Sequence, residues 1–314
     1  MAQITGNGKI FPQYFSPLRY PGGKGKLYDY IKIIIKDNNL KGGYYVEPYA
    51  GGASLALKLL QNNLVSKILI NDIDRSIYAF WYSVINQTEE LCHLIEKTNI
   101  NIDNWEKQKE IQNQKERYAL LELGFSTFYL NRTNRSGIIK GGVIGGKKQD
   151  GTWKIDARYN KDNLVDRIKT IANLKDDIEL YNMDACDFIC MADKICPSNA
   201  LFYLDPPYYI KGKELYVNHY NKEDHIEVEQ CIEKIKNRYW MVSYDYTKPI
   251  IRLYDKYCKK SYSLNYSAAS IRKKGREVIF FSHSLHAPVV KNPLKIAKSK
   301  KMMEQTYFEN VAGF

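Results

Sequence analysis

The chain has 314 residues, of which 44% are hydrophobic and 26% charged, enough for one main domain with a real core and an inserted lobe. No apolar run approaches the roughly 20 residues of a membrane span, and the N-terminus lacks the pattern of a secretory signal, so we expect a cytoplasmic protein without membrane contact. Forty-seven Lys and Arg against 35 Asp and Glu leave a net charge of +12, which favours a polyanionic partner.

The cysteines give no sign of a metal site. None of the six forms a CxxC pair, and the local group at 186, 190 and 196 matches no zinc spacing. Buried reduced thiols are the commoner state for such residues, and the five histidines also lack a ligand pattern. We predict that the protein binds no metal.

The first third of the chain alternates strands and helices. A β-prone segment at 44–47 runs into a glycine turn, and a helix follows over 53–61. A second strand at 67–71 precedes a helix at 75–86. This rhythm is typical of a parallel sheet covered by helices.

The rhythm breaks between about Asn99 and Tyr159. Polar helical stretches come first, and a glycine-rich stretch at 141–146 leads to a predicted hairpin around Asp150-Gly151. We interpret residues 99–159 as an inserted, mainly helical lobe within a catalytic domain of residues 1–98 and 160–290.

The alternation then resumes and ends in a basic tail. The predicted elements are strands at 178–181, 200–204, 239–243, 261–266 and 278–282, with a helix at 222–235. Residues 291–314 carry five lysines between 291 and 301, and we expect this tail to be partly disordered.

Two strand ends carry residues suited to a nucleoside cofactor. The glycines after Glu47 let the backbone approach a ligand closely. Asp72, at the end of the second strand, is placed to accept hydrogen bonds from ribose hydroxyls. Capping of the next helix is an equally good interpretation of Asp72.

The segment Asp205-Pro206-Pro207-Tyr208 follows a strongly apolar strand. Two consecutive prolines stop the strand and hold the backbone extended. The Asp205 carboxylate and the Pro206 carbonyl can together accept both N–H bonds of an exocyclic amine, and Tyr208 can stack on a flat base. A rigid turn alone would explain the tetrapeptide, but its position after a strand and downstream of the glycine turn favours a catalytic role.

Four motifs resemble those of Dam-type DNA adenine methyltransferases of the alpha group, and they occur in that family's order. They are Ser16–Lys24, Glu47–Gly52, Asn71–Asp74 and Asp205–Tyr208, with Tyr49 standing where Phe is common. The resemblance spans about residues 16–282. It implies a Rossmann-like fold, with a mixed, mostly parallel seven-stranded sheet and an inserted target-recognition lobe, and S-adenosyl-L-methionine as the cofactor.

The resemblance also implies the roles of individual residues. Those expected at the cofactor are Tyr20, Lys24, Glu47, Tyr49, Gly51, Gly52, Asp72, Asp184 and Asp205. Those expected at double-stranded DNA are Arg19, Asn131, Arg132, Asn134, Arg135, Lys140, Lys147, Lys148 and Arg158, because Arg and Asn can read base edges and Lys meets phosphates. A charged, solvated surface is the alternative interpretation of the lobe.

The predicted reaction is methylation of adenine at N6. A stacked adenine is out of reach, so the base must be flipped into the site, where its amine attacks the methyl group directly. An N4-cytosine enzyme is the nearest rival, while an RNA or protein-glutamine methyltransferase suits the basic insertion less well. A catalytically inactive DNA-binding module is the rival from another class. The resemblance leaves open whether a cognate restriction endonuclease shares the DNA site.

Overall fold

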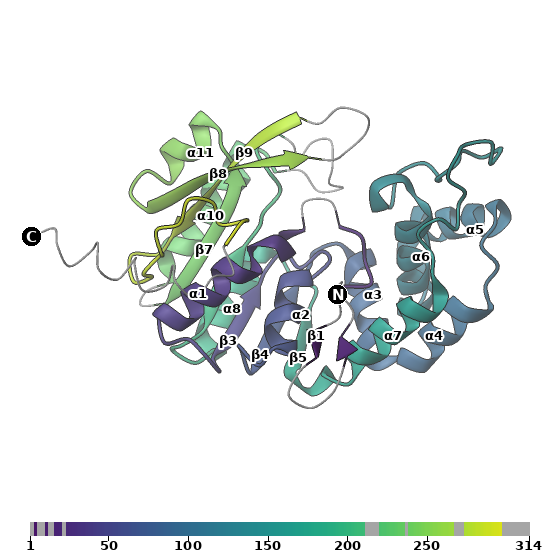
Figure 1. Ribbon diagram of the computed structural model, residues 1–314, viewed down its shortest axis with the longest axis horizontal. Coiled ribbons are helices and arrows are strands. Elements are labelled where there is room, and N and C mark those ends of the chain that lie inside the picture. The colour runs from purple at the N-terminus through teal and green to yellow at the C-terminus, as the bar shows by residue number, and fades with distance from the viewer. Residues whose placement is uncertain are drawn as a thin grey trace, which may run out of the picture.

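The computed structural model places an open sheet beside a helical lobe (Figure 1). It describes residues 3–4, 10–11, 16–20, 23–210, 220–235, 238–266 and 273–296. Of residues 3–4, 10–11, 264–266 and 273–274, only the backbone is described.

Seven strands form the main sheet in the order β5-β4-β3-β6-β7-β9-β8. The strands are β3 (Tyr44–Glu47), β4 (Lys67–Asn71), β5 (Ile178–Tyr181), β6 (Leu201–Leu204), β7 (Tyr239–Asp245), β8 (Cys258–Tyr266) and β9 (Lys273–Phe281). The first five in this order pair in parallel, and β9 runs antiparallel to both β7 and β8. A small antiparallel ribbon pairs β1 (Gln3–Ile4) with β2 (Ile10–Phe11). The predicted mixed, mostly parallel seven-stranded sheet is confirmed.

Helices cover both faces of this sheet, and the strands are apolar on both faces for that reason. Beside the sheet are η1 (Lys24–Leu27), α1 (Tyr28–Asp37), α2 (Ser54–Gln61), α3 (Arg75–Asn86), η4 (Lys175–Asp177), α8 (Ala185–Ile195), α10 (Lys222–Lys234) and α11 (Lys248–Leu253). One apolar layer joins α1, α2 and α3 to the sheet, and a second joins α8, α10 and α11 to its other face. Neighbouring residues of a strand alternate between the layers, as Tyr45 and Val46 do.

The lobe shares its core with the sheet. Within residues 99–159 its helices are α5 (Ile102–Asn113), η2 (Lys115–Arg117), α6 (Leu120–Thr133) and η3 (Arg135–Gly137). They are flanked by α4 (Thr88–Lys97) and α7 (Lys161–Ala172) of the neighbouring domain. Phe80 of α3 stacks on Phe128 of α6 with ring centroids 6.1 Å apart. A Cβ atom added to Gly124 would lie 2.5 Å from the Ala79 carbonyl oxygen, so only glycine lets these helices approach so closely. The lobe is therefore held firmly against the sheet.

Apart from the bounds of β7, β8 and β9, which are longer than predicted, three details differ from the predictions. The helix predicted from Ala53 begins at Ser54, because Ala53 has a left-handed backbone with φ of 43°. The hairpin predicted around Asp150 is wrong: among residues 144–160 the structure has turns and no strand. Left-handed backbone at Gly145 and Gly146 bends the chain there before a ladder can form. The basic tail begins in packed structure, since Leu294 and Ile296 lie against the main core; the rest of the tail, from 297 on, lies outside the described residues.

Membrane-spanning character is absent from the described helices: each is too short or too polar to cross a bilayer.

Candidate active site

A cavity of about 260 Å³ opens at the carboxyl ends of the parallel strands. Strand ends of an open parallel sheet meet at one edge, so side chains from distant parts of the chain converge there. Seven of the predicted cofactor residues line this cavity: Tyr20, Lys24, Glu47, Tyr49, Gly52, Asp72 and Asp205. The strands therefore bring together most of what the sequence motifs indicated.

Asp72 is held by the backbone of the glycine turn. Its two carboxylate oxygens accept hydrogen bonds from the N–H groups of Gly51 and Asp74, each at 2.9 Å. Burial raises the pKa of Asp72 to about 7, although both N–H groups favour the charged form. Asp74, and not Asp72, caps α3 by accepting from the Ser76 N–H at 3.0 Å. Helix capping, the alternative interpretation of Asp72, is therefore wrong.

The glycine turn is packed under an aromatic ring. A Cβ atom added to Gly51 would lie 2.5 Å from the Tyr20 ring, and one added to Gly52 would lie 2.9 Å from the Tyr20 Cβ. Gly51 also has φ of +45°, and its carbonyl accepts a hydrogen bond from Trp81 Nε1 at 2.9 Å. Gly51 thus shapes the turn and orients Asp72, while Gly52 lines the cavity itself.

Glu47 presents a buried acceptor to the cavity. It is 5% exposed, and its Oε2 atom has no hydrogen-bond partner among the described residues. Burial, reinforced by the nearby charge of Asp205, raises its pKa well above the usual value. A buried acceptor beside an open cavity is suited to a ligand that carries positive charge or N–H donors.

Asp205 follows β6, and each of its two carboxylate oxygens accepts a hydrogen bond. One carboxylate oxygen accepts from the Lys24 ammonium at 2.8 Å, and the other accepts from the Ser243 hydroxyl at 2.7 Å. The Ser243 oxygen in turn lies 2.9 Å from the Tyr203 hydroxyl. Burial raises the pKa of Asp205, while Lys24 and Ser243 favour its ionised form. The carboxylate is thus locked in place at the rim of the cavity.

Strand β7 also fixes Tyr209 and Ile210, which follow the Asp205–Tyr208 segment. The Asp245 carboxylate accepts hydrogen bonds from the backbone N–H groups of Tyr209 and Ile210, each at 3.0 Å. Ser243 and Asp245 are two residues apart, so they project from the same face of the strand. The sequence analysis missed both residues. Polar side chains at alternate positions in an otherwise apolar strand are the signal that would have found them.

The remaining residues of the proline segment differ in exposure. Pro207 lines the cavity, and Pro206 is buried. Tyr208 is only 7% exposed, lies against Tyr244, and has the Lys24 ammonium 4.9 Å from its ring centroid. Its ring offers little surface to a base in this conformation, so stacking on Tyr208 would require its neighbours to move.

Asp184 does not lie with the other predicted cofactor residues. It is exposed, and it caps α8 by accepting from the N–H of Cys186 at 2.8 Å. It is absent from the lining of the cavity. Helix capping accounts for one carboxylate oxygen of Asp184, and its contact with the cofactor stays a prediction.

Three lobe residues predicted at DNA are buried instead. Asn134 accepts from Trp105 Nε1 at 2.6 Å and donates to the carbonyls of Ile138 and Ile139, each at 2.9 Å. Asn131 donates to the carbonyls of Arg19 and Gly137, each at 2.8 Å.

Arg132, the third of them, bonds the Pro17 carbonyl, and burial lowers its pKa to about 9. Asn131 and Asn134 hold the loop at 137–140 over the cavity, because their amide groups are used in hydrogen bonds within the protein. Arg132 does not bond this loop, and its Nε has no hydrogen-bond partner among the described residues. DNA contact is therefore a wrong interpretation of Asn131 and Asn134, while for the buried Arg132 it stays a prediction.

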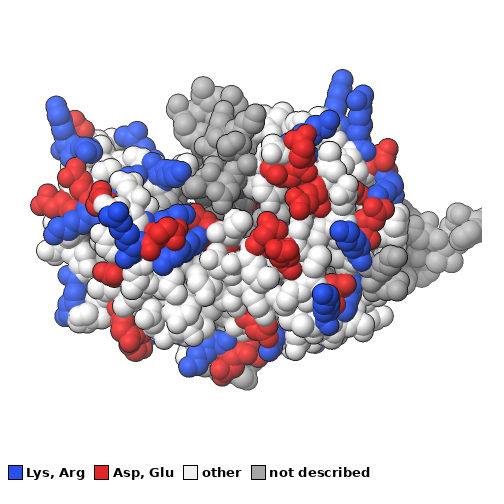
Figure 2. All heavy atoms as spheres, turned by 180° about the vertical axis from the view of Figure 1, so that it is seen from behind, with Lys and Arg blue, Asp and Glu red and all other residues white. Residues whose placement is uncertain are grey.

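The other predicted DNA residues are more accessible. Arg19 is half-buried and donates to the Asn134 carbonyl at 3.1 Å. The exposed ones are Arg135, Lys140, Lys147, Lys148 and Arg158. Figure 2 shows Lys and Arg side chains standing out along the upper margin of both halves of the molecule, with acidic residues between them.

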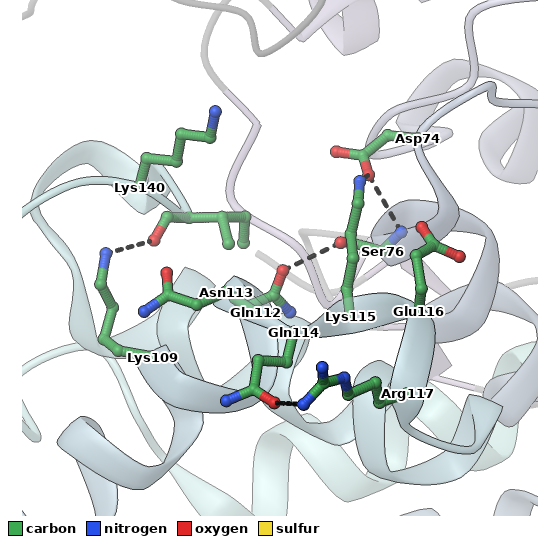
Figure 3. A pocket seen from close by; sticks show the side chains of 11 residues that line it. Asp74, Ser76, Lys109, Gln112, Asn113, Gln114, Lys115, Glu116, Arg117 and Lys140 are labelled. Atoms are coloured by element: carbon green, nitrogen blue, oxygen red, sulfur yellow. Dashed lines mark hydrogen bonds and ion pairs between the residues drawn. The ribbon is translucent and has the colours of Figure 1, made fainter.

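A second, polar cavity of about 800 Å³ adjoins the first. It lies between α5, η2 and the loop at 139–140 (Figure 3), and Asp74, Ile139 and Lys140 line both cavities. Lys115 closes one end with an ion pair to Asp74 at 2.9 Å. At the other end Lys109 donates to the Ile139 carbonyl at 3.4 Å, and burial together with Lys140 lowers the pKa of Lys109.

A five-stranded parallel sheet extended by an antiparallel pair, with a cavity of this composition at its carboxyl edge, defines an α/β methyltransferase with a Rossmann-like fold. The chain belongs to the D12 class N6 adenine-specific DNA methyltransferases, since the model of that family matches residues 20–269. It is therefore an adenine-specific DNA methyltransferase by family, as the motifs indicated.

One curated protein and two solved structures are also similar to this chain, each at low sequence identity. The type II methyltransferase M.MjaIII of Methanocaldococcus jannaschii is 22% identical over 234 residues, which cover 68% of this chain and 75% of that protein. The rRNA methyltransferase AviRa of Streptomyces viridochromogenes has a TM-score of 0.35 at 9% identity, covering 84% and 86% of the two chains. Protein LPL1258 of Legionella pneumophila has a TM-score of 0.33 at 10% identity, covering 92% of each chain.

In the part of the chain that the structure describes, no three His, Cys, Asp or Glu side chains are grouped to hold a metal ion.

Proposed function

We propose that the protein transfers a methyl group from S-adenosyl-L-methionine to the N6 amino group of adenine in double-stranded DNA, with the target base turned out of the duplex. The observation that carries this proposal is the Asp205 carboxylate, fixed at 2.8 Å from Lys24 and 2.7 Å from Ser243 at the rim of the cavity. A locked acceptor of this kind at the end of a strand is suited to bind an amine in one orientation.

The cavity fits S-adenosyl-L-methionine chemically. Asp72 offers carboxylate oxygens for the ribose hydroxyls, and the orphaned Glu47 Oε2 offers an acceptor for a cationic amino group. Tyr20, Lys24, Tyr49 and Gly52 are among the other residues that line the cavity. When bound, this cofactor supplies an electrophilic methyl carbon on a positively charged sulfur.

The protein's own groups would act on the adenine. Asp205 and the Pro206 carbonyl would accept the two N–H bonds of the amine, which draws the nitrogen lone pair out of conjugation with the ring. Lys24 and Ser243 prevent the carboxylate from turning away, so alignment and a preorganised field supply most of the rate. A base inside the duplex cannot reach Asp205, and flipping costs a few kcal/mol of lost stacking.

We assign the DNA-facing surface to the exposed cations of the lobe: Arg135, Lys140, Lys147, Lys148 and Arg158. Arg19 borders this surface but is tied to the lobe backbone. The lobe at 99–159 would then serve as the target-recognition region of a catalytic domain formed by residues 1–98 and 160–290. A restriction endonuclease that reads the same site is the proposed partner, supported by the type II naming of the M.MjaIII relative.

The decisive experiment incubates the purified protein with duplex DNA and isotopically labelled S-adenosyl-L-methionine, followed by digestion to nucleosides and mass analysis. We expect label in N6-methyl-2′-deoxyadenosine. Label in N4-methyl-2′-deoxycytidine would show the rival base specificity. Binding of DNA without binding of S-adenosyl-L-methionine would show an inactive DNA-binding module.

A further inference from the structure

Trp153 is an exposed tryptophan in the loop between η3 and α7. Its side chain is 64% exposed, whereas the chain's other three tryptophans, Trp81, Trp105 and Trp240, are 1%, 7% and 3% exposed. A large aromatic side chain left in water loses the free energy of burial, so its placement on a surface suggests a partner.

The loop that carries Trp153 is well ordered by its own hydrogen bonds. The Gln149 amide donates to the carbonyls of Ile144 and Gly146 at 2.8 and 2.6 Å, and its oxygen accepts from the Ile155 N–H at 2.8 Å. A Cβ atom added to Gly145 would lie 2.6 Å from the Trp153 carbonyl oxygen. The backbone beneath the indole is therefore tightly packed, and the ring is presented from a rigid support.

Cations outnumber acidic residues on the loop around the indole, where Asp150 and Asp156 are also exposed. The Arg158 guanidinium carbon lies 5.6 Å from the ring centroid, and the flanking Lys148 and Lys154 are exposed. Lys147 is paired with Glu106 at 2.9 Å. A flat apolar ring among cations is complementary to a partner with flat rings and negative charge, and nucleic acid has both.

We propose that Trp153, backed by Arg158, is a stacking contact with an unpaired or unstacked base of the substrate DNA. This inference rests on the proposed function and adds a contact to it. A base that loses its stacking in the duplex exposes a flat face, and an indole presented on a rigid loop can stack on such a face. The lysines beside it would meet the phosphates and hold the duplex against the loop.

Fluorescence offers a direct test, because Trp153 is the exposed member of the four tryptophans. Titration with a cognate duplex should quench and shift the emission of the wild-type protein. The same titration of Trp153→Phe should produce little change in emission.

Affinity should respond in the same direction. Trp153→Ala should weaken duplex binding by roughly 10- to 100-fold, as expected for loss of one stacked base, and Trp153→Phe should retain most of the affinity. The dependence of affinity on salt should not change with Trp153→Ala, whereas Lys148→Gln should lower the salt slope by about 0.9. Thermal melting by circular dichroism checks that each variant is folded.

Ile195→Ala is the matched control, because it removes an exposed apolar side chain far from Trp153 in the sequence. Ile195 is 53% exposed at the end of α8, on the side of the sheet where the central strand β6 begins, opposite the carboxyl ends that carry the cavity. It should bind DNA as the wild type does. Unchanged emission of the wild type on DNA binding, wild-type affinity of Trp153→Ala, or a lowered salt slope in that variant would overturn the stacking role. Absence of any methylated adenine with a normal fluorescence response would instead overturn the proposed function and leave the stacking contact standing.

Discussion

Polar side chains at the carboxyl edge of the sheet face a cavity, whereas several of those in the lobe are buried and bond the protein itself. At the edge, Glu47, Asp72 and Asp205 follow separate strands and converge on one cavity. In the lobe, Asn131 and Asn134 point into the protein and bond its backbone, while Arg135 beside them is exposed. A parallel sheet brings its strand ends to one crevice, whereas a helix end distributes neighbouring residues around its axis. Motif spacing therefore locates ligand contacts at the sheet more reliably than in the lobe.

The largest effect should come from Asp205→Ala. Loss of the carboxylate removes an acceptor that orients the amine, so we expect the methylation rate to fall by about 10³-fold or more, with duplex affinity within a few-fold of wild type. Single-turnover methylation and a DNA-binding titration measure the two effects. Asp176→Ala, an exposed carboxylate of η4, is the control and should change neither. Retained turnover by Asp205→Ala would contradict the catalytic assignment.

The next effect should be one of stability, in the lobe. Asn134→Ala would leave Trp105 Nε1 and the carbonyls of Ile138 and Ile139 unpaired in a buried position. We expect the free energy of unfolding to fall by about 3 kcal/mol, as for other losses of a buried hydrogen-bond network. Denaturant unfolding measures it. If the variant were as stable as the wild type but bound DNA poorly, Asn134 would be a DNA contact and its structural assignment would be wrong.

Ser243→Ala should slow the reaction without affecting cofactor affinity. We expect kcat to fall about 10-fold, because Asp205 loses one of the two groups that orient it. Loss of this donor also raises the pKa of Asp205, so the acid limb of the pH–rate profile should move to higher pH. Ser243→Thr keeps the hydroxyl and should restore the profile. A rate loss without a shift in the profile would indicate a packing role for Ser243.

Cofactor affinity should depend on pH through Asp72. Its folded pKa of about 7 lies above the ordinary 3.8, so between these values the folded protein holds an extra proton and its free energy of unfolding falls as pH rises. A ribose hydroxyl donates to the ionised form, so affinity should rise about fivefold from pH 6 to pH 7 and level off above pH 8. Calorimetry in two buffers should detect proton release near pH 6. Asp72→Asn should bind weakly at every pH, and a pH dependence that persists in this variant would exclude Asp72 as its source.

The last effect should be that of Arg135→Gln, on DNA binding alone. Arg135 is exposed on η3, so its loss should not change stability. DNA affinity should fall by about tenfold. If Arg135 reads a base edge, the loss should depend on the base at one position of the site; if it contacts a phosphate, the loss should be equal for all sequences. Arg117→Gln, beside the polar cavity of Figure 3, is the control for charge alone. Equal effects of the two changes would indicate general electrostatic attraction only.

Local sequence determined the elements that carry the chemistry. The predicted strands at 44–47, 67–71 and 178–181 and the helix at 75–86 coincide with β3, β4, β5 and α3, because apolar runs ending at Gly, Asp or Asn identify buried parallel strands. The same pattern placed Glu47, Asp72 and Asp205 at strand ends, which the topology of the sheet then brought together.

The tertiary structure alone decided which polar residues remain available to a partner. Asp184 became a helix cap, and Asn134 became a bridge between Trp105 and the loop over the cavity. Ser243 and Asp245 gained their roles only when β7 was paired beside β6. The residue type sets which hydrogen bonds a side chain can make. Whether those bonds are made inside the fold depends on neighbours that are distant in sequence.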